Sequence, residues 1–370
     1  MNRTVEVGRT LLVDGPASVM VVSGKVEVFG SLVKGARRIV IREGKRLPFT
    51  TEETAIFDLS LGANASVDEV EGDTIPPSWG KALESLRAMQ KRPVIALVVG
   101  GVDSGKTSFC TYLTNNLVSE KCTVAVLDED LGQSDVGPPG TVAYTYVAKP
   151  FVDMFNLGAE NAFFVGATSP SEATEKTVEG TAFLKAEILS KTTVDFLVVN
   201  TDGWVEGEDA LRFKTRLAMA LEPDVVFCLQ HQDELAPLCN AIGDLHQERV
   251  ESPAAIMQRS REKRKSLREL SYVKYFENAT VKIFPLSRLK VEGDNLHLQK
   301  VREKTLLGLY DTNKKFLGIG ILRDIDHARK ALKVFTSVTA NPSVVVFGKV
   351  RLDKNLNEVT ERTEMGTANG

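Results

Sequence analysis

Apolar residues at both ends of the chain occur in short runs that end at glycines. Over residues 1 to about 74, runs such as 18–22 alternate with turns that contain glycine. This spacing predicts short strands in a small sandwich or barrel. After about residue 286 the same texture returns, and strand-like runs occur at 308–310, 316–322 and 343–352. Both ends of the chain are therefore expected to be rich in β structure.

The middle of the chain alternates between strand-like and helix-like segments. The run 94–99 is continuously apolar, as expected of a strand that is buried on both faces of a sheet. Similar runs lie at 123–127, 162–165, 196–199, 225–229 and 281–284. Helical patterns lie between most of them, at 105–118, 171–190, 207–221 and 253–270. This alternation predicts an α/β fold with a doubly wound, mostly parallel sheet. Ser78 is a candidate cap for a further helix that continues to Gln90.

Length and composition narrow the class of protein. A chain of 370 residues is expected to form more than one domain. The net charge of −3 gives no general attraction to polyanions, so a nucleic-acid site would have to be a local basic patch. The four cysteines form no CxxC pair, which favours buried reduced thiols over zinc or disulfides. No apolar run is long enough to span a membrane, and the first ten residues do not resemble a signal peptide, so a cytoplasmic location is expected.

The most specific local motif is GGVDSGKT, which matches GxxxxGK[ST] between a predicted strand and a predicted helix. Its glycines let backbone N–H groups surround phosphate oxygens, and the following helix directs its positive end at the same anion. Lys106 is expected to bridge the β and γ phosphates, and Thr107 to offer its hydroxyl to Mg²⁺. The predicted ATP phosphate site comprises Gly100, Gly101, Val102, Asp103, Ser104, Gly105, Lys106, Thr107 and Ser108.

Two aspartates follow the next predicted strand. If Asp128 and Asp130 lie on an extended strand, both side chains face the same way. Two carboxylates on one face suit one role beside a metal and one role as a base, whereas the residues alone are also compatible with a solvated acidic turn. A GTPase is the obvious rival, but residues 230–233 read Gln-His-Gln-Asp and lack the Asn-Lys of a guanine reader, which favours ATP.

Two further features have both a functional and a purely structural interpretation. Trp204 follows the run 196–199, at the end of a strand where ligands bind in such sheets. It is either a stacking platform for a nucleobase or a tryptophan folded onto the core. The segment 258–268 is densely basic, and on a helix Arg264 and Arg268 share a face. These arginines either contact phosphates or form a solvated helix face.

The sequence resembles the RNA 5′-hydroxyl polynucleotide kinase family of archaea and eukaryotes. The resemblance rests on four features that occur in the same order: GGVDSGKT, DEDLGQ, TDGW and the arginine-rich segment. That family includes the kinase-like subunit of the messenger-RNA 3′-end cleavage complex. The sequence looks most similar to the compact archaeal members, over nearly the whole chain. The resemblance implies residue roles. Asp130 is implied as the base and, together with Asp128 and Gln133, as a residue beside the metal and its waters. Thr201 and Trp204 are implied as a clasp for the acceptor, and Arg264 and Arg268 as the arginines of the lid, although Arg259 and Arg261 offer competing registers.

The resemblance also implies a domain organisation and an activity. The expected parts are an N-terminal β domain (1–75), a linker helix (76–92), a P-loop kinase domain (93–286) with a clasp around 201–204 and a lid around 253–270, and a C-terminal β-rich domain (287–370). The implied activity is Mg²⁺-dependent transfer of the γ-phosphate of ATP to the 5′-hydroxyl end of RNA, with DNA as a second candidate acceptor and RNA-processing proteins as candidate partners. An ATP-binding scaffold with little turnover is the alternative, and a GTPase-like switch is a third possibility.

Overall fold

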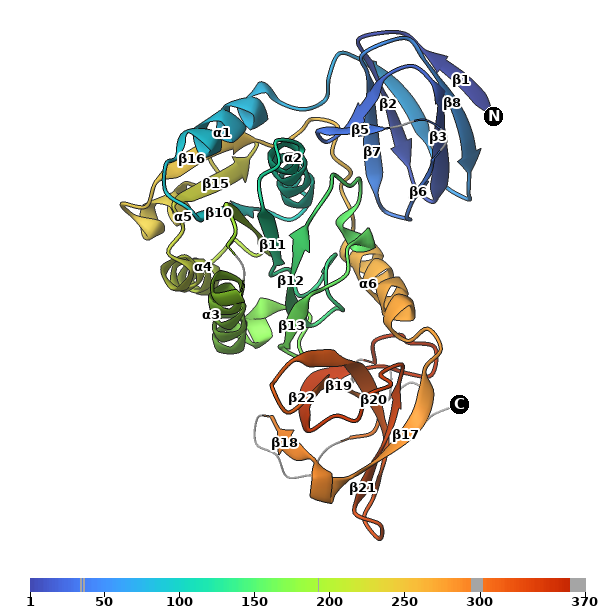
Figure 1. Cartoon of the computed structure of the whole chain (residues 1–370), viewed down its shortest axis with the longest axis vertical. Coiled ribbons are helices and arrows are strands. Elements are labelled where there is room, and N and C mark those ends of the chain that lie inside the picture. The colour runs from blue at the N-terminus through green and yellow to red at the C-terminus, as the bar shows by residue number, and fades with distance from the viewer. Residues whose placement is uncertain (34, 36, 192, 294–301, 360–370) are drawn as a thin grey trace. The chain divides into compact units, whose positions relative to one another are not determined.

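The chain has a mixed α/β fold that contains several sheets (Figure 1). The computed structural model describes residues 1–33, 35, 37–191, 193–293 and 302–359. Two compact units can be distinguished. The first comprises residues 1–127, 145–157 and 185–263, and the second comprises residues 128–144 and 158–184 and the chain from residue 264 onward.

The N-terminal strands of the first unit form two antiparallel sheets, which confirms the predicted β texture. One sheet has the order β1 (Asn2–Val5), β8 (Ala55–Leu61), β3 (Ala17–Ser23), β6 (Arg38–Ile41). The other has the order β5 (Ser31–Val33), β4 (Val26–Val28), β7 (Arg46–Thr51), β2 (Arg9–Asp14), β9 (Val67–Glu71). Side chains alternate between the two faces of a strand, and in β3 alternate residues such as Val19 and Val21 are buried in a core shared with Leu11 and Val13 of β2.

The largest sheet has seven strands. Its order is β13 (Asn161–Phe164), β12 (Thr141–Val147), β11 (Val124–Asp128), β14 (Phe196–Asn200), β10 (Val94–Gly100), β15 (Val225–Gln230), β16 (Gln247–Glu251). β10 pairs in parallel with β14 and β15, and β15 with β16, whereas β12 and β13 are antiparallel. Every residue of β10, β11, β14 and β15 is buried, as their continuous apolar runs predict.

Helices accompany these strands. They are α1 (Pro77–Ala88), α2 (Lys106–Ser119), α3 (Thr174–Lys191), α4 (Glu208–Leu221) and α5 (Ala236–Ile242), with one-turn 3₁₀ helices at Met154–Asn156, Pro170–Glu172 and Leu286–Arg288. α2 lies against β10 and β14, and Phe109 and Leu113 of α2 share a core with alternate residues of β10. The predicted helices over 105–118, 171–190 and 207–221 are confirmed. Ser78 is not a cap, because it lies inside α1 and its hydroxyl accepts the main-chain N–H of Glu251 at 3.0 Å.

The C-terminal strands of the second unit form a six-stranded sheet, which confirms the predicted β texture after residue 286. Its order is β17 (Thr280–Pro285), β21 (Ala331–Thr336), β20 (Phe316–Asp326), β19 (Thr305–Tyr310), β22 (Val344–Arg351), β18 (Lys290–Glu292). α6 (Arg261–Tyr275) precedes β17 and contributes Tyr272 to the core of this sheet.

Two predictions about the segment 253–284 are wrong. The run 281–284 lies in β17, which pairs antiparallel with β21 instead of joining the parallel sheet, because an apolar run does not identify its partner strand. The helix expected over 253–270 begins only at Arg261. The preceding residues are held in another conformation, because the main-chain N–H of Arg259 donates to Asp103 Oδ2 at 2.8 Å.

The four cysteines are free thiols, of which Cys110 and Cys228 are buried while Cys122 and Cys239 are partly exposed. The Sγ atoms of Cys228 and Cys239 are 3.4 Å apart. Within the described ranges, no helix is long and apolar enough to cross a membrane.

Candidate functional site

The predicted P-loop lies between the end of β10 and the start of α2, as the motif requires. Gly105 has a φ of +96°, a left-handed conformation that favours glycine. A Cβ on Gly100 would lie 2.6 Å from Ser104 Oγ and 2.7 Å from Leu229 O, so the tight turn also needs glycine there. The ammonium of Lys106 donates to the carbonyl oxygens of Gly100 at 2.9 Å and Gly101 at 2.6 Å. The loop and its lysine therefore form one compact cationic cradle.

A segment that precedes α6 crosses the P-loop. We call residues 253–260 the strap. A Cβ on Gly105 would lie 3.1 Å from Pro253 Cδ and 3.2 Å from Ile256 Cδ1. The guanidinium of Arg259 pairs with the carboxylate of Asp103, whose side chain is only 1% exposed, and its Nε donates at 2.8 Å. Arg259, which the sequence offered as an alternative lid arginine, is therefore bound to the P-loop and lies outside α6.

The predicted clasp loop, residues 201–204, packs directly on the P-loop. Thr201 is fully buried, and its hydroxyl donates to the carbonyl of Val98 on β10 at 2.8 Å. A Cβ on Gly203 would lie 2.7 Å from Val102 Cγ2 and 2.8 Å from both Val102 Cα and Val102 N. Only a glycine allows this approach. Thr201 therefore anchors the loop in this structure, and the sequence-predicted clasp and phosphate loop are brought together.

Trp204 is partly exposed, which favours the platform interpretation over a tryptophan folded into the core. Its ring is stacked on Phe213 of α4, with centroids 5.8 Å apart and an interplanar angle of 24°. Its main-chain N–H donates to Asp202 Oδ1 at 2.7 Å. The other oxygen of Asp202 accepts from the ammonium of Lys214, and both side chains are buried. Sequence reasoning missed Asp202 and Lys214. An Asp-Gly turn signal marked the former, whereas nothing marked the latter.

The two predicted carboxylates of the second unit differ in environment. β11 ends at Asp128, so Asp130 lies beyond the strand, and the premise that both aspartates lie on one extended strand is wrong. Asp128 is fully buried, and its Oδ2 accepts from Asp135 N at 2.7 Å, Val136 N at 3.2 Å and Ser134 Oγ at 3.3 Å. Asp128 therefore organises its own loop, and it is no solvated acidic turn.

Asp130 is partly exposed, and its carboxylate is oriented by the loop that follows it. Its Oδ1 accepts the main-chain N–H groups of Gly132 at 3.0 Å and Gln133 at 2.9 Å. Two hydrogen bonds to one oxygen restrict the rotation of the carboxylate. Of the two acidic residues, Asp130 is thus the one that combines an ordered carboxylate with access to solvent.

The lid arginines lie on α6, close to the Asp130 loop. The side-chain amide of Gln133 donates to Arg264 O at 3.0 Å. A Cβ on Gly132 would lie 3.6 Å from Asp130 Oδ1 and 3.8 Å from Arg268 Nη1. The second unit therefore brings together the predicted residues Asp130, Gln133, Arg264 and Arg268, while Arg261 is exposed at the start of the helix.

Arg268 has a partner that sequence reasoning did not find. Its guanidinium forms a two-pronged pair with Glu358, in which Nη2 donates to Oε2 at 2.7 Å. Burial disfavours the charged form of Arg268, but the hydrogen bond and the charge of Glu358 more than offset this, so the pKa of the guanidinium is raised. No local sequence signal identifies Glu358, because it lies 90 residues further along the chain.

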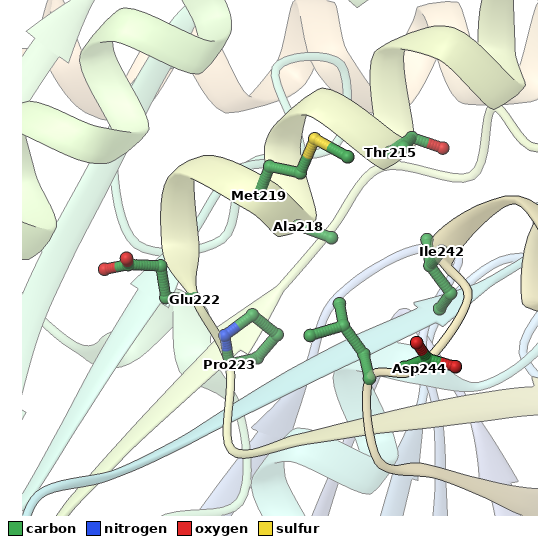
Figure 2. Close-up of a pocket in the computed structure, with 8 residues that line it drawn as sticks. Thr215, Ala218, Met219, Glu222, Pro223, Ile242 and Asp244 are labelled. Atoms are coloured by element: carbon green, nitrogen blue, oxygen red, sulfur yellow. The ribbon is translucent and has the colours of Figure 1, made fainter.

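The structure also has a hollow of about 480 Å³ that is lined by the second half of α4, the end of α5 and the residues that follow each helix (Figure 2). Met219, Ala218 and Ile242 contribute apolar surface, and Glu222 and Asp244 also line it. None of the predicted site residues lines this hollow. It is therefore separate from the P-loop and the clasp.

Comparison with known proteins agrees with this geometry. Residues 100–278 match the model of the family described as mRNA cleavage and polyadenylation factor CLP1 P-loop. This match covers slightly less than half of the chain. The matched range contains every predicted site residue from Gly100 to Arg268, whereas Glu358 lies outside it.

Proteins similar to this chain include archaeal ones, which confirms the resemblance predicted from the motifs. A protein of Pyrococcus abyssi named polyribonucleotide 5′-hydroxyl-kinase is 27% identical over 340 residues, which cover 77% of this chain and 95% of that protein. A protein of the same name from Thermococcus kodakarensis is 32% identical over 225 residues, 60% of this chain and 62% of that protein. The structure of a wild-type Clp1p–Pcf11p complex matches with a TM-score of 0.75 and 14% identity, over 95% of this chain and 97% of that one, which shows a shared fold.

Proposed function

We propose that this chain is a polynucleotide 5′-hydroxyl kinase, which transfers the γ-phosphate of ATP to the 5′-hydroxyl end of RNA. The observation that carries the proposal is the packing of the clasp loop on the P-loop through Gly203 against Val102, with Thr201 bound to Val98 of the preceding strand β10. A partly exposed tryptophan beside a phosphate cradle is suited to a nucleotide acceptor, because stacking accepts any base. The names of the archaeal relatives support the same activity.

The P-loop residues Gly100 to Ser108 bind the phosphates of ATP in this proposal. ATP use is implied by the family of P-loop kinases whose model the matched range fits. The backbone N–H groups and the N-terminus of α2 attract the phosphate oxygens. The ammonium of Lys106 is held by two carbonyl oxygens of the loop, and it exchanges them for the β and γ phosphates when ATP binds.

Mg²⁺ prefers oxygen donors. In this proposal Thr107, which is partly exposed at the start of α2, offers its hydroxyl, and Asp130 and Gln133 are the further oxygen donors that the sequence predicts. Asp128 already accepts three hydrogen bonds at one oxygen, so its role is to order the loop of Asp130. Bound Mg²⁺ would neutralise the charge that develops on the phosphates.

The acceptor is oriented by two groups in this mechanism. The first base stacks on Trp204. The carboxylate of Asp130 accepts the proton of the 5′-hydroxyl as the hydroxyl oxygen attacks the γ-phosphorus in line, the bond from the γ-phosphorus to the bridging oxygen breaks, and ADP leaves. Arg264 and Arg268 neutralise the phosphoryl group during transfer. Arg268 is bound to Glu358 in this structure, so its contribution requires exchange of that carboxylate for phosphate oxygens.

We also propose the three-part organisation that the sequence predicts, in which a doubly wound P-loop domain lies between two β-rich domains in the chain. The membership of β17 in the six-stranded sheet supports a C-terminal domain that begins before residue 280 instead of at 287. Protein partners from RNA processing, which the resemblance implies, stay a prediction.

Transfer of label from γ-³²P-ATP to a short oligoribonucleotide with a 5′-hydroxyl tests the function. We expect labelling that needs Mg²⁺ and that is absent when the same oligonucleotide already carries a 5′-phosphate. Asp130→Asn should abolish transfer and leave ATP binding intact, because the carboxylate acts on the acceptor. A matched oligodeoxyribonucleotide measures discrimination against DNA. The absence of transfer at every Mg²⁺ concentration, together with ATP binding, would favour the scaffold interpretation.

A further inference from the structure

A buried ion pair lies next to the partly exposed Trp204. The side chains of Asp202 and Lys214 are 4% and 1% exposed, and the ammonium contacts Asp202 Oδ2. Removing two opposite charges from water is expensive, and an apolar pair of similar volume is often at least as stable. The proposed mechanism assigns neither residue to the phosphates, the metal or the attacking hydroxyl. The pair therefore calls for an explanation other than stability.

The two oxygens of the Asp202 carboxylate have different partners. Oδ1 accepts the main-chain N–H of Trp204 at 2.7 Å, and Oδ2 accepts from Lys214. The ion pair to Lys214 thus fixes the direction in which Oδ1 holds the backbone of Trp204. A carboxylate is a stronger acceptor for this N–H group than a neutral group would be.

The same turn of α4 also holds the ring of Trp204. Phe213, the residue before Lys214, stacks on the indole with centroids 5.8 Å apart. The ammonium of Lys214 lies 5.0 Å from the centroid of the Phe213 ring. One helix turn therefore determines both the position of the Trp204 backbone and the plane of its indole.

We propose that Asp202 is a positioning residue, with Lys214 as its buried counter-ion, which holds the indole of Trp204 as the platform for the first base of the RNA acceptor. The inference rests on the proposed function, because it presumes that Trp204 binds the acceptor. Neither Asp202 nor Lys214 touches the reacting atoms. Their effect is therefore expected on acceptor recognition and not on the binding of ATP.

Steady-state kinetics with the 5′-hydroxyl oligoribonucleotide provide the first test. Asp202→Ala and Lys214→Met are each expected to raise the acceptor KM by about tenfold, within the range that stacking of one base supplies. The KM for ATP should change by less than about twofold, since neither substitution alters the proposed contacts of the P-loop with ATP. Arg212→Met is the matched control. It removes a cation from the same helix, but Arg212 is 69% exposed and pairs with an exposed glutamate.

A conservative substitution separates positioning from a general loss of stability. Lys214→Arg keeps the cation, so its acceptor KM should lie much closer to the wild-type value than that of Lys214→Met. If Asp202→Ala fails to fold, Asp202→Asn gives the same comparison, because it keeps an oxygen for the Trp204 N–H group and removes the charge opposite Lys214. In the background of Trp204→Ala, Asp202→Ala should add no further rise in the acceptor KM, because the platform is already absent.

Fluorescence follows the position of the indole without any measurement of activity. The chain has two tryptophans, and Trp79 is fully buried. The emission of wild-type protein minus that of Trp204→Phe therefore reports Trp204. In Asp202→Ala, we expect this emission to be more accessible to acrylamide and no longer quenched by the oligoribonucleotide at concentrations that saturate the wild-type protein.

The outcomes distinguish this inference from the proposed function. If wild-type protein transfers label, but Asp202→Ala and Lys214→Met lower only the melting temperature and leave both the acceptor KM and the Trp204 emission unchanged, the pair is merely structural and the inference is overturned. If wild-type protein transfers no label, the proposed function fails. Unchanged quenching of Trp204 in the variants would then still overturn the positioning role.

Discussion

The substitution Gly203→Ala adds one methyl group at the contact between the clasp loop and the P-loop. The added Cβ would lie 2.7 Å from Val102 Cγ2 and 2.8 Å from Val102 Cα and Val102 N. Real Cβ atoms essentially never approach other heavy atoms this closely, and two of the three neighbours are backbone atoms. The side chain of Val102 cannot relieve the overlap by rotation, so one of the two loops must move.

The expected loss follows from the geometry. Overpacking at a well-packed contact typically costs about 1–3 kcal/mol, which corresponds to a decrease of roughly 5- to 150-fold in an affinity or a rate. Val102 N is one of the amides of the phosphate loop, so the displacement should weaken ATP binding as well as acceptor binding. We therefore expect Gly203→Ala to lower kcat/KM for both substrates, whereas Trp204→Ala should affect the acceptor alone.

Initial rates with each substrate varied in turn measure both effects, and calorimetric titration gives the Kd for ATP directly. Gly158→Ala is the matched control, because a Cβ at Gly158 has no heavy atom within 4 Å. It should behave as wild-type protein. Wild-type affinity for ATP in a folded Gly203→Ala protein would refute the conclusion that the two loops are in rigid contact.

Three other substitutions test separate parts of the molecule. Lys106→Met should reduce label transfer by at least about a hundredfold, because it removes the charge expected at the transferred phosphate; a smaller loss in the transfer assay would contradict this role. Glu358→Gln leaves the partly buried guanidinium of Arg268 without its anionic partner and should lower the free energy of unfolding by about 1–3 kcal/mol in urea denaturation. Burial alone would raise the pKa of Asp14, but hydrogen bonds, mainly from Arg46, lower it overall. The charged Asp14 therefore stabilises the fold above pH 3.8, and this stabilisation is lost as the pH falls through the lower pKa of the folded state. Asp14→Asn should lower the free energy of unfolding at pH 7, and the loss should become progressively smaller toward pH 3.

Local patterns in the sequence were sufficient to predict the structure wherever a short segment determines its own conformation. The glycines and Lys106 of the P-loop, the buried run of β10 and the Thr201–Trp204 loop are contiguous signals, and each occurs where the sequence predicts it. Their chemistry is encoded by neighbouring residues, because a tight turn, a helix start and a central strand impose local demands on residue type.

Interactions between distant residues account for what the sequence could not predict. The late start of α6 depends on Asp103 and Arg259, which are 156 residues apart. The inward orientation of Asp128 depends on donors at positions 134–136, which no strand pattern reveals. Lys214 reads as an ordinary charged residue of an amphipathic helix, and only the fold shows that it is buried against Asp202.

The strap that crosses the phosphate loop is attached to its surroundings at more than one point. Arg259 binds Asp103, the carbonyl of Ala255 accepts from Arg46 on β7 at 3.1 Å, and Lys263, just beyond the strap, pairs with Glu43. Because the strap is held at both ends, a displacement at one end is passed to the other. Alteration of an N-terminal strand residue such as Arg46 can therefore change how fast a nucleotide enters and leaves, although that residue lies far from the GGVDSGKT motif in the chain.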